Sequence, residues 1–328
     1  MVAVIGPNGA GKSTLVRALA GIEPLDDGQV RCDGELWEAP GTRRVDAQRR
    51  RVGMVFQQGL LFPHLSAADN VAYGPRSRGI RRRAAEATAL TWLTRLGVGD
   101  LARRRPAQLS GGQAQRVAIA RALAGEPRLV LLDEPLSALD VGVAMALRLE
   151  LARHLADHEG VSLLVTHDAL DAMTVANRVL VIDDGRVAQE GTPSEVAQRP
   201  ATDHVARLVG LNVLRGTSSG TTIRLADGST VVSTTPARGD VRACFPPSAV
   251  TLTLAEPSGS ARNRWRGPVA SVAPHGSAVR VHVRAAGGLI ADVTPASAAQ
   301  LGLVPGAEVW STVKATEIAV YGGEERLG

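Results

Sequence analysis

The chain has 328 residues, of which 45% are apolar and 21% charged, and its formal net charge at pH 7 is +5. This length predicts two domains, and the composition is that of a folded protein rather than a disordered one. Aromatic residues make up only 3% of the chain, which argues against a nucleic-acid-binding protein that stacks bases. No apolar run reaches the roughly 18–20 residues that cross a bilayer. The N-terminus has no charged leader, so we also expect no signal peptide.

The basic residues are almost all arginines, because Lys12 and Lys314 are the only lysines. Three arginine triplets, at 49–51, 81–83 and 103–105, are interpreted as solvated surface, with nucleic acid or an anionic membrane as the alternative partner. The two cysteines are far apart and lack metal-ligand spacing, which is typical of a protein in a reducing cytosol.

Residues 1 to about 208 alternate short apolar runs with segments of helical periodicity. Such alternation predicts an α/β domain with a parallel sheet covered by helices. The stretch of about 62–124 lacks a convincing strand, and we expect it to form a helical subdomain inserted into the sheet domain. The expected strands are Val2–Ile5, Leu129–Leu132, Ser162–Thr166 and Arg178–Ile182, and the expected helices are Lys12–Ala20, Ala84–Leu96, Gly111–Ala124 and Val143–Asp157.

From 209 to 328 the sequence changes to short β-branched runs separated by Gly, Ser, Thr and Pro. This pattern predicts a second, all-β domain, either a sandwich or a small barrel. Asp240–Val250 aligns with Glu308–Ile318, 68 residues later, with an acid, a valine and an apolar ending in the same places. We interpret the domain as two related β units, 211–255 and 260–322.

A glycine-rich loop follows the first apolar strand and opens the first expected helix, which is the context of a phosphate-binding loop. Its glycines let backbone N–H groups surround phosphates, and the helix N-terminus adds a positive dipole. In such a loop Lys12 reaches the β- and γ-phosphates of ATP, and Ser13 supplies a hydroxyl to Mg²⁺. The loop consists of Gly6, Pro7, Asn8, Gly9, Ala10, Gly11, Lys12, Ser13 and Thr14.

Two carboxylates, Asp133 and Glu134, end the buried strand that begins at Leu129. A strand of this kind delivers its last residues to the carboxyl edge of the sheet, where ligands bind. Asp133 suits Mg²⁺, and Glu134 is placed to polarise an attacking water. The alternative is that the pair only caps a helix.

A second candidate anion site lies at Ser110, Gly111, Gly112 and Gln113, just before an apolar-periodic helix. The alternative is an ordinary serine cap with a flexible entry.

The order of these strings, followed by Ser137-Ala138-Leu139-Asp140 and then His167, resembles the ABC ATPase family over residues 1 to about 208. The resemblance implies a homodimer in which each ATP lies between the phosphate loop of one copy and the signature segment of the other. Ser110, Gly111 and Gln113 then touch the γ-phosphate held by the partner, with Gly112 in the same nucleotide-binding segment.

The same resemblance assigns three further residues. Gln57 matches the glutamine that senses Mg²⁺ and water, although the adjacent Gln58 leaves the assignment open by one position. Asp140 matches the residue that communicates across the dimer. His167 matches the switch histidine that contacts the γ-phosphate, the alternative being a capped or surface histidine.

Two features bear on the type of ABC protein. Phe62–Ser66 is similar to the segment of import-type members that receives a coupling helix from the membrane permease; a buried turn is the alternative. The family normally has about two more strands before the phosphate loop, including an aromatic residue that stacks on adenine. Only five residues precede Gly6 and none is aromatic, so we expect these N-terminal strands to be missing because the given chain starts late. The alternative is a lost adenine platform.

The last segment resembles the molybdate-binding Mop module, part of the wider TOBE class with OB-like β architecture, because it contains Ser260-Ala261-Arg262-Asn263 and a late Val313-Lys314-Ala315. The resemblance implies a tetrahedral oxyanion such as molybdate or tungstate as ligand. Ser260, Arg262 and Lys314 are the candidate contacts, since a dianion is bound by hydroxyls, N–H groups and cations. Alternatively they pack or pair at a subunit contact, and the module only regulates or holds the dimer.

These interpretations together predict an ATPase subunit of an oxyanion importer, with molybdate as the expected cargo. It would lie at the cytoplasmic face of the cell membrane as a peripheral protein, bind integral permease subunits, and act indirectly with a periplasmic or lipid-anchored substrate-binding protein. Sulfate, iron, polyamine or sugar are the alternative cargoes. A soluble, non-transport ABC ATPase acting on DNA or ribosomes is a remoter alternative, because the chain has one cassette and no heptad run.

Overall fold

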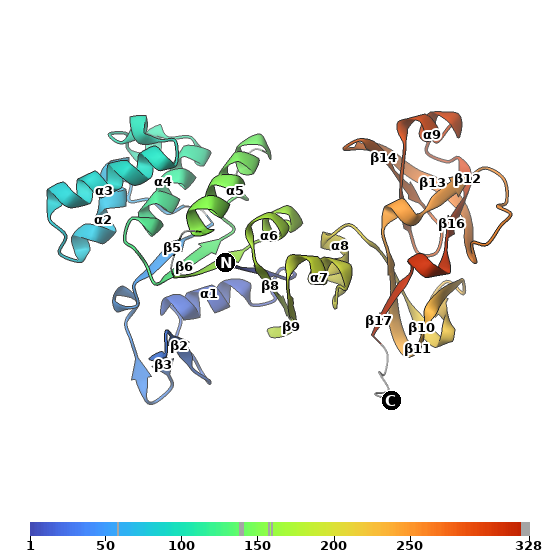
Figure 1. Cartoon of the computed structure of the whole chain (residues 1–328), viewed down its shortest axis with the longest axis horizontal. Helices are drawn as coiled ribbons and strands as arrows, with labels where there is room; N and C mark the ends of the chain where they lie inside the picture. The colour runs from blue at the N-terminus through green and yellow to red at the C-terminus, as the bar shows by residue number, and fades with distance from the viewer. Residues whose placement is uncertain (58, 138–140, 157, 159, 323–328) are drawn as a thin grey trace. The chain divides into compact units, whose positions relative to one another are not determined.

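The computed structural model describes residues 1–57, 59–137, 141–156, 158 and 160–322. The chain forms two compact units, Met1–Ser194 and Glu195–Gly328, which are described separately below (Figure 1). In the described part of the chain, no helix is long and apolar enough to cross a membrane.

The first unit is built on a six-stranded sheet in the order β5-β6-β7-β1-β8-β9. All neighbours pair in parallel except β8 and β9, which are antiparallel. This is the parallel sheet that the strand–helix alternation predicts. The strands are β1 (Val2–Ile5), β5 (Val52–Val55), β6 (Leu129–Asp133), β7 (Val161–Val165), β8 (Arg178–Asp183) and β9 (Arg186–Gly191).

Strand β6 is buried on both faces, because its side chains alternate between two apolar clusters. Leu129 and Leu131 belong to one cluster, whereas Val130 and Leu132 belong to the other. A strand buried in this way has a nearly continuous apolar sequence and exposes polar groups only at its end. The carboxylates that follow are therefore delivered to the carboxyl edge of the sheet.

The segment between β5 and β6 is helical in its described residues, and its three α-helices pack on one another (Figure 1). Ser66 caps α2 by accepting a hydrogen bond from the N–H of Asp69 at 3.1 Å. The helices of the first unit are α1 (Lys12–Ala20), α2 (Ala67–Ser77), α3 (Arg82–Arg95), α4 (Gly111–Leu123), α5 (Val141–Ala156) and α6 (Ala169–Val175); α7 (Pro193–Gln198) crosses into the second unit.

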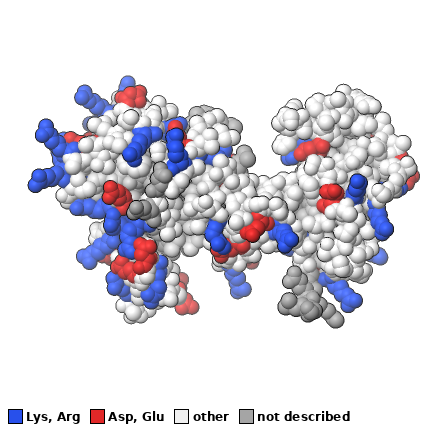
Figure 2. Space-filling model, viewed as in Figure 1, with Lys and Arg blue, Asp and Glu red and all other residues white. Residues whose placement is uncertain are grey.

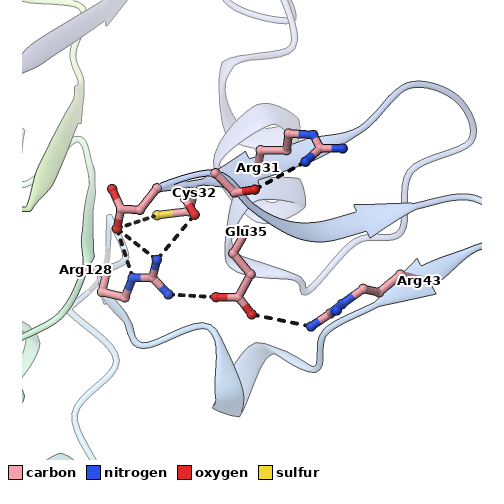
Figure 3. A network of polar contacts seen from close by, with 7 residues as sticks. Arg31, Cys32, Glu35, Arg43 and Arg128 are labelled. Atoms are coloured by element: carbon pink, nitrogen blue, oxygen red, sulfur yellow. Dashed lines mark hydrogen bonds and ion pairs between the residues drawn. The ribbon is translucent and has the colours of Figure 1, made fainter.

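A small antiparallel sheet of β2 (Val30–Cys32), β3 (Glu35–Ala39) and β4 (Arg43–Arg44) was not predicted from the sequence. Its Trp37 is 1% exposed, and the guanidinium carbons of Arg50 and Arg128 each lie about 6 Å from the ring centre. Arg128, which directly precedes β6, also donates to Glu35 at 2.9 Å (Figure 3). Long-range arginine contacts thus fix this sheet beside the sheet of the first unit.

The surface of the first unit has a mixed charge. On the face shown in Figure 2, its basic side chains are interspersed with acidic ones rather than gathered into one patch. Several arginines are paired, including Arg82 with Glu86 and Arg178 with Glu190. The arginines of the triplets at 81–83 and 103–105, and Arg49 and Arg51, are exposed as the sequence predicts. The interpretation is wrong for Arg50, which is 1% exposed and forms a buried ion pair with Glu38.

The second unit contains a three-stranded sheet, β10-β11-β17, and a five-stranded sheet, β12-β16-β13-β14-β15. Neighbouring strands pair in antiparallel fashion, as expected for the predicted all-β domain. The elements are α8 (Asp203–Leu208), β10 (Asn212–Leu225), β11 (Thr230–Phe245), β12 (Thr251–Thr253), β13 (Asn263–His275), β14 (Ala278–Val283), β15 (Leu289–Val293), α9 (Pro295–Gln300), β16 (Glu308–Val313) and β17 (Ala319–Gly322).

The strand register repeats the 68-residue spacing seen in the sequence. Ala243 of β11 pairs with Val320 of β17. Ser311, 68 positions after Ala243, pairs with Leu252, 68 positions before Val320. Each half of the unit therefore supplies a strand to the sheet of the other half, so the two halves interlock.

A second repeated string, Asn-x-apolar-Arg-Gly, was missed in the sequence; it begins at Asn212 and at Asn263. The side chain of Asn212 makes two hydrogen bonds, of 2.7 and 2.8 Å, with the backbone of Ile290. Asn263 does the same with the backbone of Val232, at 2.6 and 2.9 Å. Each asparagine thus joins its own half of the unit to the other half.

Candidate active site

The phosphate-binding loop connects the central strand β1 to α1, and its backbone requires glycine. A Cβ built on Gly6 would lie 2.0 Å from the carbonyl oxygen of Ile182, which is an impossible contact. Gly9 and Gly11 have φ angles of 83° and 97°, in the left-handed region that favours glycine. The loop therefore keeps its shape only with these residues.

Lys12 is folded back onto its own loop. Its Nζ donates to the carbonyl oxygens of Gly6 and Pro7, both at 2.8 Å, and the residue is 7% exposed. Burial lowers the pKa of this ammonium group, an effect that the nearby Glu134 and Asp133 oppose. A phosphate group that replaces the two carbonyls as partner would meet a positive charge already held in the loop.

Most of the remaining loop residues are exposed to solvent around the start of α1. Asn8, Gly9, Ser13 and Thr14 are exposed, whereas Ala10 is buried. The first turn of α1 contains no acidic residue. Its N–H groups and the helix dipole are therefore suited to an anion.

Ser13 and Asp133 form an oxygen pair suited to a hard cation. Burial raises the pKa of the Asp133 carboxyl, and interaction with the Ser13 hydroxyl opposes this effect. A divalent cation bound there would offset the desolvation of Asp133 with its own charge. The donor set fits Mg²⁺.

Glu134 lies where the ends of three parallel strands meet. Its Oε2 accepts a hydrogen bond from Nε2 of Gln57 at 2.9 Å, and its Oε1 lies 3.3 Å from Nδ1 of His167. Gln57 follows β5, Glu134 follows β6 and His167 follows β7, so the strand order brings the three side chains together. Gln58, the other glutamine considered, lies outside the described residues.

The backbone of Glu134 has a φ of 47°, which is rare for a residue with a side chain. Its N–H is bonded to the carbonyl of Val165 at 3.0 Å, which holds the residue in this conformation. Backbone strain of this kind is concentrated at functional sites. The strained backbone points the carboxylate at Gln57 and His167.

The Ser110–Gln113 segment is a capping box at the start of α4. Ser110 Oγ accepts from the N–H of Gln113 at 3.3 Å, and Gln113 Oε1 accepts from the N–H of Ser110 at 2.9 Å. Gly111 is exposed and Gly112 is half-buried. Each of these two side chains thus accepts a hydrogen bond from the backbone N–H of the other residue within one chain. Asp140 lies outside the described residues.

Comparisons with known proteins agree with this geometry. A family model described as ABC transporter matches residues 1–137, and one described as TOBE domain matches residues 259–320. The molybdenum import ATP-binding protein ModC of Mycobacterium tuberculosis is 43% identical over 98% of this chain and 91% of its own length. The chain belongs to the ATP-binding proteins of ABC transporters.

Other members of this family and a solved structure are also similar. The Fe(3+) ions import ATP-binding protein FbpC of Streptomyces coelicolor is 40% identical over 98% of this chain and 89% of its own length. A structure described as the dimeric post-hydrolysis state of the ATP-binding cassette MJ0796 bound to ADP and Pi has a TM-score of 0.53 and 32% identity, covering 59% of this chain and 85% of its own. The predicted fold class, an ABC ATPase domain followed by a β-rich TOBE domain, is confirmed.

In this ABC ATPase the segment after Gln57 is held by α4. Arg121 donates to the carbonyl oxygens of Leu60 at 2.9 Å and Gly59 at 3.1 Å. Its guanidinium carbon lies 5.5 Å from the ring centre of Phe62, and burial lowers its pKa. Arg121 was not predicted from the sequence, because no local sequence pattern indicates a contact between residues about sixty positions apart.

The Phe62–Ser66 segment is shaped from within by Asn70. This residue is fully buried, and its side chain accepts from the N–H of Phe62 at 2.8 Å and donates to nearby carbonyls, including that of Ser66 at 3.0 Å. The ring of Phe62 lies 4.7 Å from that of Tyr73, which is 51% exposed. The segment therefore combines a rigid backbone with an aromatic surface.

In the TOBE domain the three candidate oxyanion contacts are exposed. Arg262 and Lys314 are the sequence neighbours of the paired residues Asn263 and Val313, so both lie at the same end of the β13–β16 pair. Ser260 precedes β13, and its turn is held by Arg264, which donates to the carbonyls of residues 259 and 261.

Proposed function

We propose that this ABC ATPase chain is the ATP-hydrolysing subunit of an oxyanion importer, with molybdate as cargo. The observation that carries the proposal is the convergence of Gln57, Glu134 and His167 at the strand ends beside the phosphate-binding loop. A base, an amide and a histidine at one sheet edge are suited to hydrolysis rather than to binding alone.

ATP binding uses the phosphate loop. Lys12 exchanges its two loop carbonyls for β- and γ-phosphate oxygens, and the N–H groups at the start of α1 bind the same phosphates. Mg²⁺ neutralises phosphate charge when bound, and Ser13, Asp133 and Gln57 are the residues that hold it.

Hydrolysis uses Glu134 as general base. The water oxygen attacks the γ-phosphorus, its proton passes to the Glu134 carboxylate, and the bond from phosphorus to the ADP oxygen breaks. Gln57 orients the carboxylate and the water through its amide. His167 contacts a γ-phosphate oxygen and thereby reports whether the terminal phosphate is present.

The complete site needs two copies of the chain. Ser110, Gly111 and Gln113 of one copy contact the γ-phosphate bound by the other, with Gly112 in the same nucleotide-binding segment, and Asp140 acts across the same interface. The dimeric state named for the similar cassette structure supports this arrangement. Opening of the capping box between Ser110 and Gln113 frees both side chains for the phosphate.

The protein then acts at the cytoplasmic face of the membrane as a peripheral subunit. Phe62–Ser66 receives a permease helix, and a periplasmic or lipid-anchored binding protein delivers the cargo to that permease. The molybdenum import relative supports molybdate, and the iron import relative, which matches an equal share of this chain, keeps Fe³⁺ as the second candidate.

The TOBE domain binds the oxyanion through Ser260, Arg262 and Lys314. Two cations at one strand end and a hydroxyl in the segment before β13 suit a tetrahedral dianion. Isothermal titration of the full chain with molybdate, tungstate and sulfate tests this assignment. Heat of binding with molybdate supports it, and no binding by any of the three anions removes the TOBE domain as the oxyanion site.

The hydrolytic proposal is tested with Glu134→Gln. We expect the purified chain to hydrolyse Mg-ATP and this variant to lose about 10²–10⁴-fold in turnover while still binding ATP. Glu190→Gln is the matched control, because Glu190 is an exposed acid that pairs with Arg178 on the same unit. Equal turnover of the wild type and Glu134→Gln would refute Glu134 as the base.

A further inference from the structure

A buried ion pair lies directly behind His167. Arg148 of α5 is 5% exposed, and its Nε donates to Oδ1 of Asp171 in α6 at 2.6 Å; Asp171 is 4% exposed. Burying two charges removes both from water, so such a pair adds little net stability compared with apolar residues. Its position beside the catalytic site points to another use.

Hydrogen bonds from this pair reach both neighbours of His167. Asp171 Oδ2 accepts from the hydroxyl of Thr166 at 2.7 Å, and that hydroxyl accepts from the N–H of Asp168 at 3.0 Å. Arg148 also donates through Nη2 to Oδ2 of Asp168 at 3.1 Å. The residues before and after His167 are therefore both bound, directly or through Asp171, to Arg148.

His167 itself is held much less firmly. Its side chain is 55% exposed, and its Nδ1 lies 3.3 Å from Oε1 of Glu134. Arg148, His167 and Glu134 line the same cavity of about 220 Å³. The orientation of the imidazole toward Glu134 thus depends on the backbone that the buried ion pair fixes.

The helix that carries Arg148 begins at Val141, the residue that follows Asp140 in sequence. An arginine can serve Asp171 and Asp168 together because its guanidinium presents several donors in a fixed plane, which a lysine does not. Movement of α5 relative to α6 would therefore change the position of the His167 backbone.

We propose that Arg148 is a positioning residue of the hydrolytic site: through Asp171, Thr166 and Asp168 it sets the orientation of His167 relative to Glu134 and makes that orientation depend on α5. This inference rests on the proposed ATPase function of the same site. It adds a residue that sequence motifs do not mark and a route from α5 to the switch histidine.

The first experiment compares Arg148→Met with the double variant Arg148→Met/Asp171→Asn. The single variant leaves a buried carboxylate without its partner and is expected to lose thermal stability. The double variant removes both charges and keeps an acceptor for Thr166, so its stability should return toward the wild type. We expect both variants to lose about 10- to 100-fold in kcat, with little change in the KM for ATP, because misplacement of a catalytic group affects the chemical step.

Two matched variants complete the series. Arg148→Lys keeps the charge but not the planar set of donors, and should also lower kcat. Glu150→Gln removes an ion pair with Arg116 from the same helix and should leave kcat unchanged. Recovery of wild-type kcat in the stable double variant would overturn the positioning role.

A second readout does not depend on turnover. The imidazole resonance of His167, assigned by comparison with His167→Asn, should shift in Arg148→Met/Asp171→Asn and stay in place in Glu150→Gln. An unshifted resonance would contradict the inference. If the wild type hydrolyses no ATP, the proposed function fails, and the resonance still decides whether Arg148 positions His167.

Discussion

The candidate residues of the two domains are held in different ways. One set lies at the carboxyl edge of the first-unit sheet, and the other lies in the TOBE domain where β13 begins and β16 ends. Gln57, Glu134 and His167 follow adjacent parallel strands, and Glu134 contacts both of the others within a single chain. Arg262 and Lys314 lie at one end of the β13–β16 pair and are exposed. The first arrangement is set by buried topology, whereas the second is set by two surface side chains that a few mutations can change.

The two halves of the TOBE domain extend this comparison. The positions that correspond to Arg262 and Lys314 at the end of β10 and β11 are Leu211 and Pro246, beside the paired residues Asn212 and Phe245. The fold is thus repeated, but the pair of cations is present in one half only. The two halves therefore share a backbone arrangement but not the side chains at this strand end.

The largest effect is expected at the phosphate loop. Lys12→Ala removes the buried cation, and we expect ATP affinity to fall by about 10- to 100-fold, since a hydrogen bond to a charged group contributes about 1.5–3 kcal/mol. Arg17→Ala, on the same helix but exposed, is the control. Titration with a fluorescent ATP analogue measures both, and equal affinities would contradict the assigned role of Lys12.

The next effect is on the stability of the TOBE domain. A Cβ on Gly216 or Gly267 would lie 2.3 Å from the carbonyl oxygen of Arg224 or Arg284, respectively. We expect Gly216→Ala and Gly267→Ala each to destabilise this domain by about 1–3 kcal/mol or more, because backbone must move to accept the methyl group. Thermal unfolding checks this, and strongly unequal losses would show that the two halves are not equivalent in packing.

A smaller, pH-dependent effect is expected at Asp133. Burial raises the pKa of this carboxyl in the folded chain, so the folded state favours the protonated form. In the absence of nucleotide and Mg²⁺, the wild type should therefore lose stability relative to Asp133→Asn as the pH rises through the folded-state pKa toward neutrality. Unfolding of both proteins across this pH range tests the sign. A wild type that gains stability relative to the variant over that range would contradict it.

The smallest effect on stability is expected at Lys314, directly after β16 in the TOBE domain. Lys314→Gln changes an exposed side chain, so unfolding should be unaffected, whereas molybdate affinity should fall by about tenfold through the loss of one charge-assisted contact. Arg266→Gln, an exposed arginine of β13 that pairs with Glu308, is the control. Unchanged molybdate binding in Lys314→Gln would remove Lys314 from the site.

Short local sequence patterns, apolar runs and a glycine-rich loop, predicted the sheet and the phosphate loop of the first unit. Val2–Ile5 and Leu129–Leu132 are buried on both faces and therefore have apolar sequences without alternation. The motif order supplied the candidates Glu134 and His167. The contacts of Glu134 with Gln57 and His167, however, follow from the strand order β5-β6-β7, which no local pattern encodes.

The elements that were missed depend on distant contacts. The sheet of β2, β3 and β4 has short strands of mixed composition, and Trp37 is buried there by Arg50 and Arg128. The Asn212 and Asn263 strings were overlooked because their spacing differs from the 68 residues that relate the later strands. No motif marks Arg148, because its partner Asp171 lies in α6 and its partner Asp168 lies in the loop before α6.

The most direct test of the account is whether Mg-ATP brings two copies together at a site that combines Glu134 of one copy with Ser110 of the other. Analytical ultracentrifugation of Glu134→Gln with and without Mg-ATP should show a dimer only with nucleotide, and adding Ser110→Trp should abolish that dimer. In the otherwise wild-type chain, Ser110→Trp should also abolish turnover. A chain that stays monomeric with Mg-ATP, together with undiminished hydrolysis in Ser110→Trp, would contradict a site shared between two copies.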